Sequence, residues 1–413
     1  MLARPMSRLF YGWRVVAVCL VAAVFANALG LFGAGVYLHV LVDSKGWSTG
    51  AVSSSIALFY VSSALLLLPV GGIIGRAGPQ PVFAVGAAAL ASGVAAVGQV
   101  TQPWQTYVVF VVMGIGWACL STTAVATTLA PWFERHQGRA VSIASLGASV
   151  GGMVGAPILI AGTTRLGFAT TTATSAAVAL VVVLPLALFV MKRRPQDLGL
   201  WPDGAVDARS MTSGIEQSWS RRSALRTTAL RSVTLGFGIA MMVQVGFITH
   251  QVTLLSPSLG AGGASLTVSA TAITALLGRL MLARFADQMS ARLTASAMMM
   301  LAAAALTMQA LFPVPAVLIL GSVLMGFTIG NVTTLAPIIV RREFGPESFG
   351  ALYGGASCVI QLCMALGPSF YGLLHDAFGS YRVPLLLAAV GDLVAAFVVS
   401  AGAAMAVRSS TDR

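Results

Sequence analysis

Arg279 is the residue whose place in this sequence most strongly implies chemistry. It lies within Thr271-Ala-Ile-Thr-Ala-Leu-Leu-Gly-Arg-Leu-Met-Leu-Ala283, inside an apolar stretch long enough to cross a bilayer. A cation at membrane depth costs at least ~2.5–3.5 kcal/mol, so such residues are rare and usually line a polar cavity. A guanidinium matches a carboxylate with two parallel hydrogen bonds. We therefore predict that Arg279 binds an anionic substrate.

Other polar and aromatic residues near the midpoints of apolar segments complete the predicted substrate site. They are Asn27, Tyr60, Trp117, Ser149, Gln244, Asn331, Ser357 and Gln361. Sites for small ligands are mostly apolar and contain a few placed polar groups, which this set resembles. For each residue taken alone, a hydrogen bond between two helices is the alternative to substrate contact.

His250 and Asp392 are the candidates for proton coupling. Imidazole titrates near neutral pH, and Asp392 is the one acid deep in a predicted span. His250 lies ~6 residues from the outer end of its span and Arg279 ~15 residues from the outer end of its own, an axial gap of ~13 Å. We therefore expect no direct contact between His250 and the substrate. A gating or structural role for His250, and a structural or protonated state for Asp392, stay open.

The composition indicates a polytopic membrane protein. Of the 413 residues, 57% are hydrophobic and 9% are charged, and the mean hydropathy is +0.88. A soluble domain carries roughly 25% charged residues, so a large soluble core is excluded. The net charge of +12 does not indicate nucleic-acid binding, because the basic residues lie in short loops between apolar runs.

Twelve apolar segments are long enough to be transmembrane helices, which need ~20 residues each. They predict an all-α membrane protein, and their ranges are 13–38, 49–74, 81–100, 104–130, 139–163, 168–191, 230–256, 264–286, 293–312, 314–340, 349–374 and 383–406. With the N-terminus in the cytoplasm, twenty of the 24 basic residues fall on the cytoplasmic side and three outside. The positive-inside rule therefore predicts that both termini are cytoplasmic.

The segments divide into two six-helix bundles. Residues 1–191 form the predicted N-terminal bundle, 192–228 a basic cytoplasmic linker, and 229–413 the C-terminal bundle. The halves repeat at an offset of about 211 residues, since Ala140–Pro157 aligns without gaps to Ala351–Pro368. Parallel repeats of this kind characterise one class of transporter. Gly147, Gly151 and Gly155 form a ridge where another helix can approach closely.

These features resemble the major facilitator superfamily. Gly71-x-x-x-Gly75-Arg76-x-Gly78 is similar to that superfamily's loop signature, which in the family helps to latch the halves in one conformation. The resemblance implies that Gly71, Gly75, Arg76 and Asp287 belong to the latch. Gly75 stands where the signature has an aspartate, so the first copy departs from the family, whereas the second copy keeps Asp287.

Within the superfamily, the chain resembles the monocarboxylate porters and the oxalate:formate exchangers. Tyr11-Gly-Trp-Arg14 and Pro131-Trp-Phe-Glu-Arg-His-Gln-Gly-Arg-Ala140 are similar to signatures of that group. The resemblance implies that an arginine of the eighth span, here Arg279, contacts the substrate carboxylate. Animal proton-coupled members place an aspartate where this chain has Ala275. Exchangers of the oxalate type add a lysine in the eleventh span, which is missing here, so a monocarboxylate fits better than a dicarboxylate.

We predict a secondary transporter of small organic anions, working by alternating access as a proton symporter or an anion exchanger. The alternatives are an exporter of amphipathic drug-like compounds and, in another class, a membrane receptor or sensor. No enzyme is expected, because the sequence shows no nucleophile–base pair and no metal cluster, and no cofactor is expected. We expect a monomer in the bacterial cytoplasmic (inner) membrane. Its predicted partners are a small carboxylate, protons if it is a symporter, and the lipid bilayer, but no nucleic acid.

Overall fold

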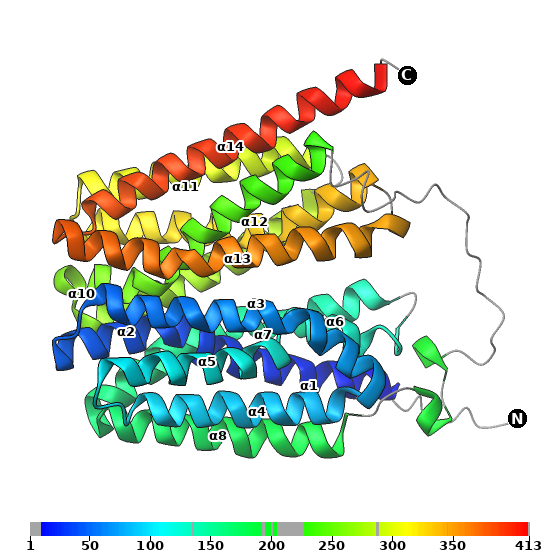
Figure 1. The fold of residues 1–413 in the computed structure, drawn as a ribbon, viewed down its shortest axis with the longest axis horizontal. Coiled ribbons are helices and arrows are strands. Elements are labelled where there is room, and N and C mark those ends of the chain that lie inside the picture. The colour runs from blue at the N-terminus through cyan, green and yellow to red at the C-terminus, as the bar shows by residue number, and fades with distance from the viewer. Residues whose placement is uncertain are drawn as a thin grey trace, which may run out of the picture.

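The computed structural model describes residues 10–133, 136–191, 195–199, 201–204, 227–285, 289–344 and 346–411. Within these ranges the chain forms helices, turns and short loops, and no β-strand occurs. The predicted all-α class is therefore confirmed. Figure 1 shows long helices that run roughly parallel to one another across the view.

Six spans build the N-terminal half. The first is a single broken helix, in which α1 (Tyr11–Ala26) passes through a π-helical turn, η1 (Asn27–Leu31), into α2 (Phe32–Lys45). The fourth is also broken, because α5 (Pro103–Cys119) and α6 (Thr122–Leu129) meet at Ser121, whose side chain caps α6. The others are α3 (Thr49–Ala77), α4 (Pro79–Val97), α7 (Gln137–Leu166) and α8 (Phe168–Phe189).

The C-terminal half contains α10 (Thr228–Phe285), α11 (Ala291–Leu311), α12 (Pro315–Phe344), α13 (Pro346–Phe378) and α14 (Arg382–Thr411). α10 is a hairpin of two spans, because Gly260 has φ 68° and ψ 167°, a left-handed conformation that favours glycine. Gln251 Nε2 donates to Thr271 Oγ1 at 2.7 Å, so the two arms run antiparallel. The eleven helices that could cross a membrane therefore make twelve crossings in the described chain, as predicted.

The two halves lie side by side, and both ends of the chain point the same way (Figure 1). We call this the linker end, because α1 begins there, α14 ends there, and two short 3-10 helices of the linker, Pro195–Leu198 and Pro202–Gly204, lie there. The opposite end is called the far end. The remainder of the predicted linker and Asp287 lie outside the described residues.

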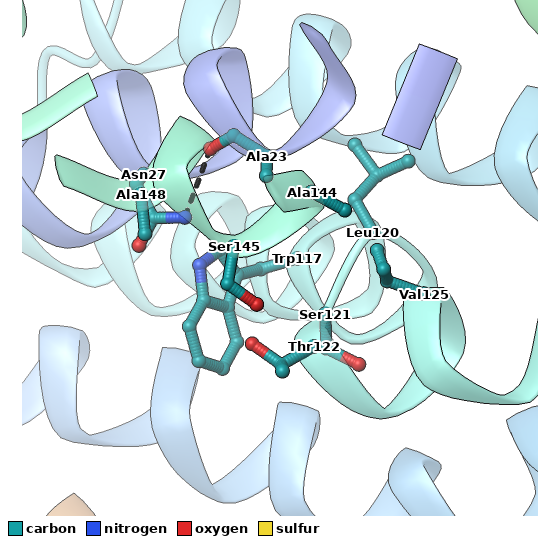
Figure 2. A pocket seen from close by; sticks show the side chains of 10 residues that line it. All are labelled: Ala23, Asn27, Trp117, Leu120, Ser121, Thr122, Val125, Ala144, Ser145 and Ala148. Carbon is teal, nitrogen blue, oxygen red and sulfur yellow. Dashed lines mark hydrogen bonds between the residues drawn. The ribbon is translucent and has the colours of Figure 1, made fainter. Parts of the chain in front are cut away.

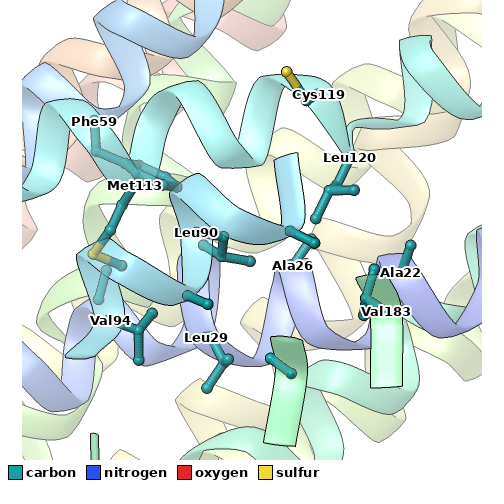
Figure 3. Close-up of a cluster of buried hydrophobic side chains, with 14 of the residues drawn as sticks. Ala22, Ala26, Leu29, Phe59, Leu90, Val94, Met113, Cys119, Leu120 and Val183 are labelled. Atoms are coloured by element: carbon teal, nitrogen blue, oxygen red, sulfur yellow. The ribbon is translucent and has the colours of Figure 1, made fainter. Parts of the chain in front are cut away.

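The core of the N-terminal half gathers around α1 (Figure 3). Leu90 and Val94 of α4 and Met113 of α5 pack there with Leu29 and Phe59. Burial of each such side chain contributes ~1.5–3 kcal/mol where water is the alternative; within lipid, close packing is what holds the helices together. The first half therefore behaves as one packed unit.

The predicted glycine ridge is confirmed as a packing surface. A side chain at Gly147, Gly151 or Gly155 of α7 would collide with α1 or η1, at Leu20, Val24 and Ala28 respectively. Glycines four residues apart give a flat strip on which a neighbouring backbone can lie. The ridge therefore fixes the π-helical turn against α7.

Arg292 braces the C-terminal half at the linker end. Its Nε and Nη2 lie 2.5 and 2.8 Å from the two carboxylate oxygens of Glu343, and Nη1 donates to Ser232 Oγ and to the carbonyl of Val399. The arginine is 4% exposed. The sequence analysis counted Arg292 among the basic residues of the cytoplasmic side. Its burial was not predicted, because its partners come from helices that are distant in sequence.

The halves meet at the far end and separate toward the linker end. The main buried cluster of the N-terminal half continues into Val252, Leu255 and Val268 of α10, so the far-end core is shared. Helices α3 and α13 are in contact at the far end, where Gly372 packs on Ser53, whereas toward the linker end Gly72 of α3 and Gly354 of α13 have open space beside them. The described conformation is therefore closed at the far end and open at the linker end.

Candidate substrate site

Arg279 lies on the second arm of α10, at the seam between the two halves. Its Nη1 donates to Ser149 Oγ of α7 at 2.9 Å, across that seam. Ser149 is 4% exposed, whereas Arg279 is half-buried. The fold therefore brings these two candidate substrate residues together.

The guanidinium of Arg279 has free hydrogen-bonding capacity. Among the residues that the structure describes, no carboxylate lies within ion-pair distance, and the bond to Ser149 is its one side-chain hydrogen bond. A guanidinium carries five N–H donors. The fork is thus available to an anion that arrives from solution.

Arg279 lies closer to the linker end of its span than to the far end, as its position in the predicted span indicated. The second arm of α10 begins directly after Gly260, about four residues before the expected start at Ala264. Arg279 is followed by a short stretch to Phe285, ~9 Å at 1.5 Å per residue. The open linker end therefore gives the shorter path from Arg279 to solution.

A small pocket lies within the N-terminal half. Figure 2 shows the side chains around it, from α1, the α5–α6 break and α7: Ala23, Asn27, Trp117, Leu120, Ser121, Thr122, Val125, Ala144, Ser145 and Ala148. Its volume is about 30 Å³, room for one or two water molecules. Ser145 in its wall and Ser149 beside Arg279 are one helical turn apart, so the pocket and the cation share a face of α7.

The aromatic part of the pocket is packed rather than loose. Trp117 lies 5.7 Å from Phe59 and 6.2 Å from Tyr60, measured between ring centroids. Tyr60 is fully buried; it packs against Trp117 and is not among the residues that line the pocket. Asn27 does reach it, and its Nδ2 donates to the carbonyl of Ala23 at 2.9 Å. Asn27 opens a π-helical turn, a feature that is frequent at functional sites.

The remaining predicted residues belong to the C-terminal half. Asn331 of α12 is buried and lies against Gly278, the neighbour of Arg279. Gln244 of α10 is 1% exposed, and neither its amide oxygen nor its nitrogen has a partner among the described residues. Ser357 and Gln361 of α13 are half-buried. No contact of these three residues with Arg279 is shown, so their substrate role stays a prediction.

An apolar plug closes the site toward the far end. Ile248, Ala275 and Ile329 of the C-terminal half form a buried cluster with Leu31 and Phe32 of the first span. Ala275, the position of the aspartate in proton-coupled relatives, is part of this plug. An ionised carboxylate there would be buried among aliphatic side chains, which is costly without a partner.

His250 lies away from the seam. Its Nε2 is 3.0 Å from the carbonyl of Pro368 and its Nδ1 is 2.9 Å from Tyr381 Oη, while its ring stacks on Tyr371. A carbonyl only accepts, so Nε2 donates, and neutral Nδ1 accepts from the tyrosine. Both nitrogens are thus used within the C-terminal half. This geometry favours the structural alternative, and coupling by His250 stays untested.

Asp392 of α14 is fully buried, and neither carboxylate oxygen has a hydrogen-bond partner in the described part of the chain. An unpaired ionised carboxylate in such a place would be very costly, so the neutral, protonated form is the reasonable state. Of the alternatives kept open for Asp392, this site favours the protonated state, since no hydrogen bond to a neighbouring helix occurs among the described residues.

The predicted latch residues Gly71, Gly75 and Arg76 lie in the last turns of α3, at the linker end. Arg76 is exposed, and a side chain added at Gly71 would meet only Thr127 Oγ1, at 3.9 Å. The neighbouring Gly72 and, on α13, Gly354 have open space beside them. The latch residues therefore line the separated linker end, where they stay candidates for contact in another conformation.

Sequence reasoning missed the plug and the pocket wall at Ser121 and Thr122. Leu31, Phe32 and Ile329 carry no polar group that would distinguish them from ordinary membrane-span residues. A signal existed for Ser121, because Ser-Thr-Thr after an apolar run is a helix-start pattern.

Comparison with known proteins agrees with this arrangement. The model of the Major Facilitator Superfamily matches residues 20–263 and, separately, residues 233–408. Among curated proteins, the chain is 23% identical over 183 residues to the "Uncharacterized MFS-type transporter YcxA" of Bacillus subtilis (strain 168). That match covers 44% of this chain and 45% of that protein, so it spans less than half of the relative.

Two solved structures share the fold at low identity. One is a bacterial homolog of the human lysosomal transporter Spinster, in an inward-facing and unoccupied conformation, with TM-score 0.73, 14% identity and coverage of 98% of both chains. The other is a mutant of the nucleoside transporter NupG, with TM-score 0.73, 13% identity and coverage of 95% of this chain and 99% of that one.

Proposed function

Because the chain belongs to the major facilitator superfamily and is a membrane transporter, not an enzyme, we propose that it moves small organic anions, chiefly monocarboxylates, by alternating access. The observation that carries this proposal is the Arg279 guanidinium, which lies at the seam of the two halves with no carboxylate beside it among the described residues. A buried cation without a fixed counter-ion binds anions in preference to cations.

The seam location supports transport rather than static binding. Ser149 belongs to one half and Arg279 to the other, so a carboxylate bound here contacts both bodies that move in alternating access. A carboxylate that accepts from Arg279 and from the Ser149 hydroxyl bridges the halves. Substrate can therefore influence which conformations are populated, because it makes different contacts in each.

The number of charges supports a monocarboxylate. Arg279 is one guanidinium, and it pairs with one carboxylate in the bidentate geometry. A second carboxylate would lie in the pocket formed by Trp117, Asn27 and Ser145, which contains no basic side chain. The alanines of this wall leave room for a short carbon skeleton.

The described state corresponds to the inward-facing conformation of this proposal. Basic residues predict that the linker end is cytoplasmic, and the linker end is the open one. Two mechanisms remain within the proposal. Exchange requires that the carrier does not change conformation readily while Arg279 has no anion bound. Symport requires a protonatable group, and this group must lie elsewhere because Ala275 has no titratable side chain.

Uptake into proteoliposomes tests the proposal. Purified protein is reconstituted, and labelled formate, lactate and pyruvate are compared with oxalate and succinate. We expect uptake of monocarboxylates, stimulated by unlabelled monocarboxylate inside for exchange or by an inward proton gradient for symport. Transport of amphipathic cations without carboxylate uptake would instead establish the exporter alternative and overturn the proposal.

A further inference from the structure

The far end is closed by a carboxylate placed on the start of a helix in the other half. Asp376, near the end of α13, accepts hydrogen bonds from Ser48 Oγ at 2.5 Å and from the backbone N–H of Gly50 at 2.7 Å. Ser48 is the N-cap of α3, and its Oγ also accepts from the N–H of Ala51. One side chain of the C-terminal half thus satisfies donors in the first turn of an N-terminal helix.

The approach depends on glycine. A Cβ at Gly50 would lie 2.7 Å from Asp376 Oδ2, closer than real Cβ contacts allow. One turn inward along both helices, Gly372 of α13 packs directly onto Ser53 of α3, where a side chain would collide. Two glycines, one on each helix, therefore allow the two backbones to approach closely.

The contact is electrostatically favourable only when the carboxylate is ionised and the far end is closed. The first turn of a helix has unpaired N–H groups and a positive dipole end, which an anion stabilises. Hydrogen bonds to an ionised acceptor are about twice as strong as neutral ones. When the halves separate at the far end, Asp376 exchanges these donors for water.

The internal repeat has no second contact of this kind. At the offset of about 211 residues, Asp376 corresponds to Arg165 at the end of α7, and Gly50 corresponds to Ala261 at the start of the second arm of α10. Arg165 is exposed, and Gly260 and Gly262 have open space around them. A cation at a helix start is unfavourable. The α3–α13 seam therefore carries the one cap of this design among the described residues.

We propose that Asp376 is the far-end gating residue, whose carboxylate on the N-terminus of α3 holds the transporter in the conformation that opens at the linker end. The proposal rests on transport by alternating access, as proposed above, but not on the identity of the substrate. Removing the charge shifts the population toward the conformer that is open at the far end.

Distances between spin labels measure this shift without substrate. The four native cysteines are first replaced. One pair of labels then spans the two halves at the far end (Ser44→Cys with Ser380→Cys), and a second pair spans them at the linker end (Ala130→Cys with Arg341→Cys). All four positions are exposed. Asp376→Asn keeps the shape of the side chain and removes its charge. We expect the fraction of molecules that are open at the far end to rise about 10-fold. In that fraction, the distance between the two labels at the linker end should become shorter.

Two further variants and a matched control make the test decisive. Ser48→Ala removes one donor and should shift the same distances by a smaller factor, and Gly50→Ala should shift them through steric exclusion. Asp43→Asn removes another exposed far-end carboxylate and should leave both distributions unchanged. Unchanged distances in Asp376→Asn, or equal shifts in Asp43→Asn, overturn the gating role, whereas a failure of carboxylate uptake alone leaves these distances as predicted.

Discussion

The seam around Arg279 and the brace around Arg292 place the same side chain in opposite surroundings. Arg292 gives its donors to Glu343, Ser232 and backbone carbonyls of the same half, and is 4% exposed. Arg279 gives one hydrogen bond to a serine of the other half and keeps a partly exposed guanidinium. Both charges lie away from bulk water, but only the first has a carboxylate partner in the described structure.

The difference separates structural from functional charge. A buried ion pair that has all its partners within one rigid body can hold helices together, but it has no capacity left for a ligand. A guanidinium between two bodies that move keeps its capacity free, and its own placement stabilises neither body. Substitution of either arginine, or of the residues that contact it, tests this distinction.

Arg292→Ala should have the largest effect on folding. It removes the hydrogen bonds by which Arg292 joins Glu343 and Ser232, each worth about 0.5–1.5 kcal/mol. Glu343 is itself exposed, so the loss comes from these bonds and from the packing of the buried arginine. Thermal unfolding in detergent should show a clear loss of stability, measured against Arg341→Ala, which removes an exposed arginine of α12. Equal stability of the two variants would contradict the assignment of Arg292 as a brace.

Arg279→Lys should have the largest effect on transport. Lysine keeps the charge but not the planar fork, so carboxylate uptake should fall about 100-fold or more, equivalent to ~2.7 kcal/mol, while the unfolding temperature stays near that of the parent. Proteoliposome uptake and thermal unfolding of the same preparation measure both. Full uptake by the lysine variant would exclude the bidentate clamp.

Ser149→Ala should have an intermediate effect. It removes one hydrogen bond, of about 0.5–1.5 kcal/mol, between substrate or arginine and the N-terminal half, so uptake should fall roughly 3- to 10-fold. Ser145→Ala, one turn away in the pocket wall, is the matched comparison, and its effect should depend on the carbon skeleton of the substrate. A loss as large as that of Arg279→Lys would assign the primary contact to the serine.

Arg292→Met combined with Glu343→Leu should have the smallest effect. Methionine fills the space of the buried Arg292 side chain, and Glu343 lies at an exposed position, so no charge is left unpaired in the interior and the free energy of unfolding should change by less than in Arg292→Ala. Transport should continue at a comparable rate. Loss of uptake in this stable double variant would show that the brace also acts in the transport cycle, and would break the comparison.

The spans were predictable from the sequence, and so was the presence of Arg279 inside one of them, whereas its role in substrate binding stays a prediction. A run of about twenty apolar residues usually forms a membrane-spanning helix, and an arginine within such a run usually faces a polar cavity. Single positions were therefore informative. The hairpin at Gly260 was also visible, because an apolar run of that length must turn. Trp117 and Asn27 followed from their depth alone, and both reach the pocket.

The contacts between distant segments were not predictable. Asp376 and Ser48 are polar residues at loop edges, and 328 positions separate them, so neither stands out. Arg292 was counted with the basic residues that indicate membrane topology, because no residue near it in the sequence indicates a contact with Glu343. His250 and Asp392 were candidates because both are titratable. Their surroundings depend on how the helices of the C-terminal half pack, which the sequence pattern alone does not give.

The apolar plug has an electrical consequence. The site is open toward the linker end, whereas Leu31, Phe32 and Ile248 close it toward the far end. Most of the membrane potential therefore falls between the site and the far end. With a carboxylate bound, the Arg279 site is neutral and crosses this field at little cost. Without one it carries a positive charge, and each 100 mV changes the energy of that movement by up to ~2.3 kcal/mol. If the linker end is cytoplasmic, as the basic residues predict, the proposed mechanism implies that a negative-inside potential favours the linker-end-open conformer of the empty carrier.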